Sequence, residues 1–400
     1  MRVLLADKLS DSVISRLQES GCEVKMQPEL KGESLTAALG EFDPQILVVR
    51  STKVLEADFD AASSLELVVR AGAGYDNIDV SKASGSGVFV ANCPGKNSAA
   101  VAELAIGLIL ALDRSIPDNV MDARNGAWNK AKYGKSDGIK GKTLGIVGIG
   151  NIGKEVIRRA HGLEMSVVAW SRSLTSAVAA ELGVTKMDSP NAVAAASDIV
   201  SLHVASNSDT KGLAGASFFE AMREGSFLIN TTRGAVVDEG AMCRAIESKG
   251  IRVGLDVFSN EPAVKTGEFD HPLASNAGVY LTHHIGASTA QAQEAIAQEA
   301  ARIIQCYTAS GDVPNCVNLS VHSPATHQLT VRHLDKVGVL SRVLNEVSVA
   351  NWNIQEMENV VFDEARAACA YIRFDGAADE EVVGRIRVLE DVLAVSLIAL

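Results

Sequence analysis

Short apolar runs alternate with amphipathic stretches along the first part of the chain. Residues 3–6, 46–49 and 67–69 are apolar and rich in valine and leucine, whereas residues 10–20 carry apolar side chains at helical spacing and end at Gly21. Buried strands of a parallel sheet are typically continuous apolar runs of this kind, separated by helices that cover both faces. The pattern therefore predicts a parallel α/β sheet.

A longer apolar segment, residues 99–112, predicts a buried helix with Asn97 or Ser98 as its N-cap. Because this segment is apolar on several faces, we expect it to pack between domains or subunits. The alternation then restarts, with a helix expected at 152–161 and a long helix at 291–308. The expected strands of this second series are 143–147, 167–170, 199–204, 226–229, 253–257 and 278–281. Such a βαβ series is of Rossmann type.

From about residue 327 the order of elements changes. The apolar spacing predicts strands at 328–331, from 352, at 367–374 and at 392–397, and helices at 337–350 and 379–387. This β-α-β-β-α-β order is typical of a small ferredoxin-like unit. We therefore expect α/β architecture throughout, with two Rossmann-like lobes and a third, appended module.

The charge of the chain excludes one class of function. The 400 residues include 37 Lys and Arg against 49 Asp and Glu, which gives a formal net charge of −12. A protein that binds nucleic acid or an anionic membrane through a broad surface needs a basic face. We expect neither partner here, and an anionic small-molecule substrate would require positive charge gathered at one place.

The cysteines and the apolar runs suggest a compartment. Six cysteines are spread along the chain without a CxxC pair, so we expect reduced thiols and no metal site. The apolar run at the start is too short for a signal sequence, and no stretch of about 18 apolar residues is present. These features predict a soluble cytoplasmic protein.

A glycine-rich loop follows the strand at 143–147 and opens the helix after it. The run Gly148-Ile-Gly150-Asn151-Ile152-Gly153 is a GxGxxG in the context that dinucleotide binding requires. The first glycine allows the tight turn, the second lets the backbone approach a pyrophosphate, and the third lets helix and strand pack closely. The helix N-terminus stabilises the anion.

The residues after the next strand leave the choice of cofactor open. Proteins that bind NAD usually carry a carboxylate about 20 residues beyond the glycine loop, where it holds the ribose 2′-hydroxyl. This chain has Ser171 and Arg172 at that place. A guanidinium suits a 2′-phosphate, although Arg172 also has the simpler interpretations of stacking on adenine or facing solvent. We expect the cofactor to be NAD or NADP, with NADP accepted.

Three polar residues follow three successive predicted strands. Arg233, Glu261 and His284 supply what the oxidation of a 2-hydroxy acid needs. A guanidinium grips a carboxylate, a histidine takes the hydroxyl proton, and a carboxylate on the other imidazole nitrogen orients the ring and raises its pKa. Each residue alone would more often be structural; together, behind a dinucleotide loop, they indicate a dehydrogenase.

The segments that carry these residues resemble the D-2-hydroxy-acid dehydrogenase family. The resemblance spans nearly the whole chain and includes RAGAGYDNID at 70–79, NCPGKN at 92–97 and GKTLG at 141–145. Within the family, the likeness is to enzymes that oxidise D-3-phosphoglycerate to 3-phosphohydroxypyruvate, the entry to serine synthesis. It implies that Arg233 binds and polarises the substrate, that Glu261 orients His284, and that His284 is the acid/base.

Further site residues are implied by the same resemblance. Cofactor contacts are expected at His203, Thr231, Thr232, Asp256 and Gly286, in addition to the glycine loop, Ser171 and Arg172. Substrate contacts are expected at Arg50, Arg70, Ala73, Gly74, Asn97 and Lys130, the last of them in the site of a neighbouring subunit. The family usually has proline before the catalytic histidine, and here that position is His283, which we interpret as a bystander.

The C-terminal part resembles an ACT domain, a small ligand-sensing module. The resemblance implies effector contacts at His333, Asp335 and Asn353 across a dimer interface. Because Asp335 would repel the carboxylate of serine, feedback by serine is less expected than a role in oligomerisation alone. We expect a homodimer or homotetramer.

Three domains are expected along the chain. A discontinuous, flavodoxin-like substrate lobe is expected at 1–95 with 286–318, a dinucleotide-binding lobe at 96–285, and the ACT-like module at 325–400.

A glyoxylate or hydroxypyruvate reductase of the same family is the alternative that Arg172 favours. A redox sensor or corepressor that binds the dinucleotide is a further alternative from a different class.

Overall fold

A computed structural model describes residues 1–262 and 266–400. The chain divides into two compact units, Met1–Asn318 and Leu319–Leu400. The first unit contains two parallel sheets and the second a single antiparallel sheet. No helix in the described residues has the length and apolar character that a membrane crossing needs.

The first sheet is parallel and has the strand order β2-β1-β3-β4-β5. Its strands are β1 (Arg2–Leu5), β2 (Glu23–Met26), β3 (Ile46–Val49), β4 (Leu67–Arg70) and β5 (Phe89–Asn92). Its helices are α1 (Asp11–Glu19), α2 (Glu33–Phe42), α3 (Glu56–Ala61), α4 (Val80–Gly85) and α13 (Ala290–Ser310). Two apolar clusters bury alternate side chains of the same strands, one on each face, so the strands read as continuous apolar runs.

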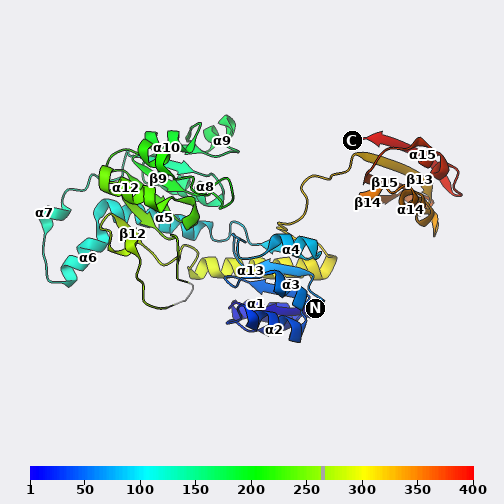
Figure 1. Cartoon of the computed structure of the whole chain (residues 1–400), viewed down its shortest axis with the longest axis horizontal. Helices are drawn as coiled ribbons and strands as arrows, with labels where there is room; N and C mark the ends of the chain where they lie inside the picture. The colour runs from blue at the N-terminus through cyan, green and yellow to red at the C-terminus, as the bar shows by residue number, and fades with distance from the viewer. Residues whose placement is uncertain (263–265) are drawn as a thin grey trace. The chain divides into compact units, whose positions relative to one another are not determined.

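Helix α13 returns to this first sheet from late in the sequence. Ile296, Ala300 and Ile303 lie in the same apolar cluster as Val13 of α1 and Val48 of β3. Helix α13 contacts α1 and β4, and Figure 1 shows it (yellow) within this blue lobe, although more than 200 residues separate it from them along the chain. The lobe is therefore built from two pieces of the sequence, and the exact boundaries at 95 and 286 remain predictions.

The second sheet is also parallel and has the order β12-β11-β10-β9-β6-β7-β8. Its strands are β6 (Thr143–Val147), β7 (Ser166–Trp170), β8 (Thr185–Lys186), β9 (Ile199–Leu202), β10 (Phe227–Asn230), β11 (Arg252–Leu255) and β12 (Val279–Leu281). Its helices are α5 (Ser98–Arg114), α6 (Ile116–Arg124), α7 (Lys130–Tyr133), α8 (Asn151–Gly162), α9 (Ser176–Glu181), α10 (Pro190–Ala196), α11 (Ala216–Ala221) and α12 (Glu239–Lys249). The strand order reverses beside β6, where a doubly wound sheet binds its ligand.

The apolar helix predicted at 99–112 is α5, and its N-cap is Asn97. Ala102, Ala105, Ile109 and Leu112 pack in one cluster with strands of the second sheet and with α8. Helix α5 also contacts α13 of the first lobe, so its several apolar faces pack within one lobe and against the other.

The second unit has the predicted β-α-β-β-α-β order and the antiparallel strand order β14-β15-β13-β16. Its elements are β13 (His327–Leu334), α14 (Val339–Val349), β14 (Asn353–Val361), β15 (Ala367–Asp375), α15 (Glu380–Arg387) and β16 (Val392–Ala399). Helix α14 begins later than predicted, because Gly338 adopts a left-handed conformation with φ 87° and Val337 is fully exposed before it. Trp352 stacks on Phe374 at 4.1 Å between ring centroids within this core.

A buried carboxylate fixes α13 to the segments around it. Glu299 accepts hydrogen bonds from Arg302 (2.6 Å) and Asn315 (2.9 Å), and pairs with Lys96 (3.2 Å). Its side chain is only 8% exposed, and these donors, Arg302 first, lower its pKa to about 2. The ionised form of Glu299 therefore stabilises the fold.

We expect Glu299→Gln to lower the free energy of unfolding by about 1–3 kcal/mol at neutral pH. Because the folded-state pKa is depressed, this contribution is present above the carboxyl's ordinary pKa and is lost as pH falls toward 2. The variant should therefore differ most from the wild type at neutral pH and converge with it in acid. Urea titrations across pH measure this, with Glu41→Gln, an exposed carboxylate, as the matched control. Equal stability of Glu299→Gln and wild type at pH 7 would contradict the assignment.

Candidate active site

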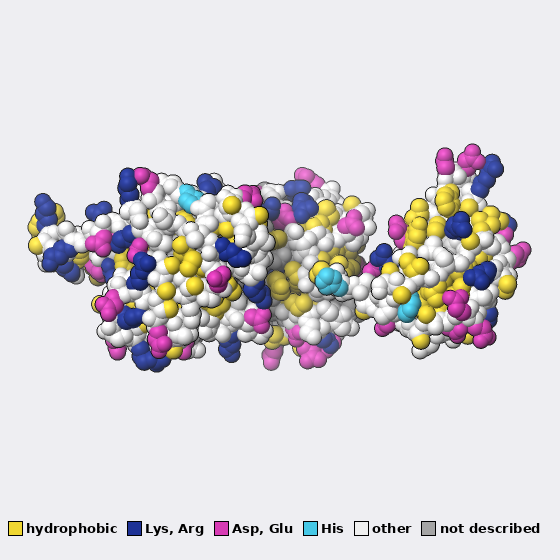
Figure 2. Space-filling model, turned by 90° about the horizontal axis from the view of Figure 1, so that it is seen from above, with side chains coloured by type: hydrophobic (Ala, Val, Ile, Leu, Met, Phe, Trp, Pro, Cys, Tyr) yellow, Lys and Arg dark blue, Asp and Glu magenta, His cyan; other side chains and the backbone are white. Residues whose placement is uncertain are grey.

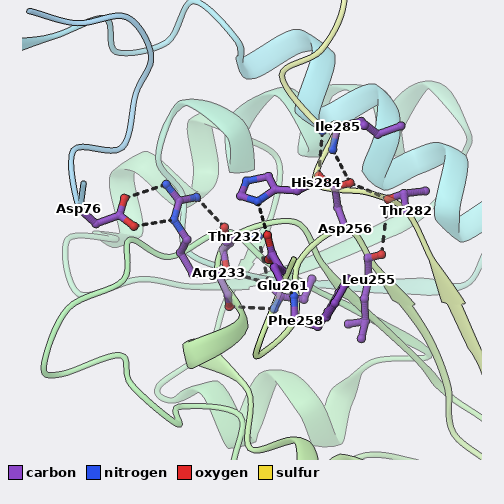
Figure 3. Close-up of polar contacts among 12 residues, drawn as sticks. Asp76, Thr232, Arg233, Leu255, Asp256, Phe258, Glu261, Thr282, His284 and Ile285 are labelled. Atoms are coloured by element: carbon purple, nitrogen blue, oxygen red, sulfur yellow. Dashed lines mark hydrogen bonds and ion pairs between the residues drawn. The ribbon is translucent and has the colours of Figure 1, made fainter. Parts of the chain in front are cut away.

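Arg233, Glu261 and His284 lie just beyond the carboxyl ends of three neighbouring strands. They follow β10, β11 and β12, which are adjacent in the second sheet. Figure 3 shows the guanidinium of Arg233 and the imidazole of His284 side by side, and the charge of Arg233 acts on the pKa of His284. The parallel sheet therefore brings together three residues that the sequence separates.

The imidazole of His284 is held by the carboxylate of Glu261. His284 Nδ1 lies 2.7 Å from Glu261 Oε2, and Glu261 Oε1 accepts from the backbone N–H of Phe258 at 3.1 Å. This hydrogen bond to Glu261 raises the pKa of His284, against the opposing effect of burial. Among the described residues Nε2 has no hydrogen-bond partner, so this nitrogen is available to exchange a proton. The side chain of His284 is 49% exposed, which its predicted acid/base role requires.

The loop that carries His284 is anchored by Asp256, which is 1% exposed. Asp256 Oδ1 accepts from Thr282 Oγ1 (2.6 Å) and from the backbone N–H of Ile285 (2.8 Å), and Oδ2 accepts from the N–H of Gly286 (2.8 Å). The carbonyl of Asp256 accepts from the N–H of His284 at 3.0 Å. Both carboxylate oxygens therefore fix the loop, and the predicted cofactor contact of Asp256 stays a prediction.

Within this anchored loop His284 has a positive φ of 51°, which is unusual for a residue other than glycine. Strained backbone of this kind persists only where its surroundings impose it, and it is common at functional sites. The neighbouring His283 is directed elsewhere: its ring meets the edge of Phe269 at 6.4 Å. His284 is therefore the member of the pair that the structure joins to Glu261.

Arg233 is held at two places. Its Nε and Nη2 meet the two carboxylate oxygens of Asp76 at 3.3 and 2.9 Å, and its Nη1 donates to the carbonyl of Thr232 at 2.8 Å. A Cβ at Gly74 would collide with Nη2, so only glycine allows this approach. Buried Asn230 shapes the turn, accepting from the N–H and hydroxyl of Thr232 at 3.0 and 2.7 Å.

Two further predicted arginines lie after the strands of the first sheet. Arg70 ends β4 and Arg50 follows β3. Burial and the charge of Arg233 lower the pKa of Arg70 to about 10, with Asp76 opposing the shift, and burial also lowers that of Arg50. Arg70 Nε is buried without a partner among the described residues. Arg70, Asp76 and Arg233 therefore form one electrostatic group.

The glycine loop has the geometry of a dinucleotide cradle. Gly148 has φ +100°, and a Cβ there would lie 2.6 Å from the carbonyl oxygen of His203. A Cβ at Gly153 would collide with the carbonyl of Gly148, whereas one at Gly150 would meet nothing within 4 Å. The first and third glycines are required by close packing, and the second leaves open space where a pyrophosphate needs it.

Unpartnered polar atoms lie in the adjoining turns. His203 Nδ1 and Thr231 Oγ1 are buried without a hydrogen-bond partner in the described part of the chain, as is Asn97 Oδ1. His203 Nε2 meets Ser201 Oγ at 2.8 Å, and burial lowers the pKa of His203 to about 3, so the ring is neutral. Such orphaned atoms are costly unless a ligand satisfies them. These residues fit a bound dinucleotide.

The ribose position differs from the expectation in one respect. Arg172 is exposed, but its Nη1 pairs with Asp209 Oδ2 at 2.8 Å. Asp209 stands on a turn that Asn207 and Thr210 tie together: Asn207 Oδ1 accepts from the N–H of Asp209 at 3.0 Å, and Thr210 Oγ1 donates to Ala205 at 2.6 Å. Asp209, which belongs to a different loop, therefore supplies a carboxylate beside Arg172.

Comparisons with known proteins show the family of the chain. Residues 106–286 match the family model of the D-isomer specific 2-hydroxyacid dehydrogenase NAD-binding domain. The chain is 35% identical over 367 residues to the D-3-phosphoglycerate dehydrogenase of Mycobacterium bovis, covering 90% of this chain and 67% of that one. The chain belongs to the D-isomer specific 2-hydroxyacid dehydrogenase family.

Two solved structures of the family are similar to the chain. The NAD+-bound 3-phosphoglycerate dehydrogenase of Entamoeba histolytica has a TM-score of 0.67 at 26% identity, covering 80% of this chain and 99% of that one. The NADPH-dependent glyoxylate/hydroxypyruvate reductase of Sinorhizobium meliloti has a TM-score of 0.68 at 30% identity, covering 79% and 96%. The curated phosphoglycerate dehydrogenases are longer: the chain spans 57–67% of their length.

The remaining predicted residues have surroundings of their own. Lys130 belongs to α7, which has no buried residue. In the second unit, His333 is buried between Leu334 O (2.8 Å) and Asn359 Oδ1 (3.1 Å), whereas Asp335 and Asn353 are exposed. Strand register sets His333 and Asn353 at opposite ends of the sheet, so one chain alone does not bring the proposed effector residues together.

Three residues of the site were not assigned from the sequence. Asp76, Asn230 and Asp209 act through contacts that only the folded chain reveals. Asp76 lies inside the RAGAGYDNID motif, two residues after Gly74, which was a predicted substrate contact. This position was the signal that could have identified Asp76 as a site residue. Asn230 and Asp209 stand in turns with no motif of their own.

Replacing Glu261 tests the origin of the raised pKa of His284. In Glu261→Gln the ion pair is lost, so the pKa of His284 should fall. With His284 as the predicted base, the oxidation rate should rise with pH as the imidazole loses its proton. In the variant this rise should shift to lower pH, with a reduced plateau. Profiles of kcat/KM against pH measure this, with exposed Glu268→Gln as control. An unshifted profile would show that Glu261 does not set this pKa.

Proposed function

We propose that the protein catalyses the NAD(P)-dependent oxidation of D-3-phosphoglycerate to 3-phosphohydroxypyruvate. The observation that carries the proposal is the hydrogen-bonded His284–Glu261 pair beside Arg233, at the same sheet edge as the glycine loop. Arg50 and Arg70 add positive charge on the side where a second anionic group of the substrate would lie. The similarity to phosphoglycerate dehydrogenases supports this choice of substrate.

Arg233, Glu261 and His284 each have a separate role in the proposed oxidation. Arg233 binds the substrate carboxylate and polarises the oxygen on C2. His284 Nε2 removes the hydroxyl proton, and the Glu261 carboxylate stabilises the imidazolium that forms. The nicotinamide, when bound, supplies the acceptor for the hydride that leaves C2. In the reverse direction His284 returns the proton to the carbonyl oxygen.

The cofactor is held by the glycine loop, Asn151 and Ile152, with His203, Thr231, Thr232 and Gly286 lining the nicotinamide side. We propose that both NAD and NADP are accepted. Arg172 offers a guanidinium to a 2′-phosphate, whereas its pairing with Asp209 reduces its free positive charge and places a carboxylate near the ribose. Substrate contacts are assigned to Arg50, Arg70, Ala73, Gly74, Asn97 and, from a neighbouring subunit, Lys130.

The second unit is proposed to be an ACT-like module that helps the chain to form a homodimer or homotetramer. Figure 2 shows hydrophobic side chains gathered on the visible face of this unit. Its exposed large apolar side chains include Met357, Val360, Phe362, Leu393 and Ile398. Binding of an amino acid by His333, Asp335 and Asn353 would require residues of two chains.

A glyoxylate or hydroxypyruvate reductase is the second candidate function. Arg172 favours it through NADPH, and the Sinorhizobium meliloti enzyme is a structural neighbour with that cofactor. A sensor that only binds the dinucleotide is less well supported, because it has no need of the complete Arg233, Glu261 and His284 set.

Steady-state rates with D-3-phosphoglycerate, D-glycerate and glyoxylate, each with both cofactors, test the proposal. We expect the highest kcat/KM for D-3-phosphoglycerate, at least about tenfold above D-glycerate, because charged hydrogen bonds to the phosphate are lost with the smaller acid. A preference for glyoxylate with NADPH would support the second candidate, and no turnover of any substrate would support the sensor.

The two histidines provide a paired test. His284→Asn should reduce kcat by about 10²–10⁴-fold with dinucleotide affinity unchanged, because the proton acceptor is removed. His283→Asn is the matched control and should retain activity. Rates and cofactor titrations of both variants decide this, and a loss confined to His283→Asn would reverse the assignment.

A further inference from the structure

The guanidinium of Arg233 has a carboxylate partner that comes from a distant segment. Asp76 follows β4 of the first sheet, 157 residues before Arg233, and meets both Nε (3.3 Å) and Nη2 (2.9 Å). Figure 3 shows this two-point contact, with the carboxylate facing one edge of the guanidinium. A fork of this kind fixes the plane and the direction of an arginine side chain, not only its charge.

The remaining donors of Arg233 can be counted. A guanidinium has five N–H groups. Asp76 takes the Nε proton and one proton of Nη2, and the carbonyl of Thr232 takes one proton of Nη1. One N–H on Nη1 and one on Nη2 therefore stay without a partner among the described residues. These two are sufficient to meet a substrate carboxylate or the oxygen on C2.

The surroundings are built to accept this pair. Gly74, two residues before Asp76, lacks the Cβ that would collide with Nη2 of Arg233. The hydrogen bond from Arg233 is also the first cause of the lowered pKa of Asp76, so the carboxylate is ionised. The charge of Arg233 lowers the pKa of Arg70 and the charge of Asp76 raises it, so Asp76 offsets the repulsion that Arg233 exerts on Arg70. Without Asp76, two arginines would face each other uncompensated.

We propose that Asp76 is a positioning residue for Arg233: it holds the Nε–Nη2 edge so that the two remaining N–H groups face the substrate. The inference rests on the proposed function, because it assigns a role to a partner of the substrate-binding arginine. Asp76 then orients the side chain of Arg233, as Glu261 orients the ring of His284. A carboxylate that instead occupied the place of the substrate would compete with it, and its removal would improve binding.

The variant Asp76→Asn separates these two possibilities. We expect kcat/KM for the best of the three substrates to fall by roughly ten- to hundredfold, since a misplaced catalytic group has effects of this size. The KM of the hydroxy acid should rise, whereas the affinity for the dinucleotide alone should not change. Asp60→Asn is the matched control: Asp60 is equally exposed and paired with Lys82, but it lies on α3, away from Arg233. It should leave kcat/KM and KM unchanged.

The coupling to Arg233 is measured with Arg233→Lys and the double variant. Lysine cannot form the two-point contact, so Asp76→Asn should cost little more activity in the Arg233→Lys background than Arg233→Lys alone. Thermal unfolding of each variant accompanies the rates. An Asp76→Asn enzyme with unchanged kcat/KM, with a lower KM, or with the same loss in both backgrounds would overturn the positioning role while the proposed function stands. A wild-type protein without turnover on any of the substrates would overturn the function and the positioning role together.

Discussion

The buried carboxylate of Asp256 is the interaction on which the geometry of the site depends. It stands at the end of β11 and accepts hydrogen bonds from Thr282, Ile285 and Gly286, while its carbonyl accepts from His284. A buried carboxylate without these donors would be strongly destabilising, so the loop has one low-energy arrangement. In that arrangement the backbone of His284 is left-handed and its ring meets Glu261.

Carboxylates also stabilise the part of the site that carries the arginines. Charged residues follow strand β4 of the first sheet and strands β10, β11 and β12 of the second. Residues of opposite charge lie together among them. Positive charge from Arg70 and Arg233 is tolerated because Asp76 lies with them, and Glu261 plays the same part for His284. In a chain with net charge −12, this local gathering of arginines is what an anionic substrate would meet.

The apolar pattern predicted the architecture well because strands buried on both faces leave a direct trace in the sequence. The runs at 46–49 and 143–147 became β3 and β6, and the glycine loop acquired the packing that its motif implies. Strands β2, β5 and β8 and helix α7 are among the elements that were not anticipated. Strand β2 is a mostly polar edge strand and α7 buries nothing, so neither leaves an apolar trace in the sequence.

The site was only partly predictable from the sequence. The strand-end positions of Arg233, Glu261 and His284 follow from the pattern of the sheet. The pairs Asp76–Arg233 and Arg172–Asp209 do not, because each joins loops whose approach depends on tertiary packing. The grouping of His333, Asp335 and Asn353 was inferred from a resemblance, and the register of β13 and β14 separates Asn353 from His333 within one chain.

Transfer of a labelled hydride is the most direct test of the central claim. D-3-phosphoglycerate deuterated at C2 is incubated with the protein and oxidised NAD or NADP, and the reduced dinucleotide is analysed by mass spectrometry. The account predicts that the deuterium is transferred from C2 as deuteride and appears on the nicotinamide ring, and that 3-phosphohydroxypyruvate accumulates in equal amount. Absence of reduced dinucleotide with either cofactor, or reduced dinucleotide without the label, would contradict it.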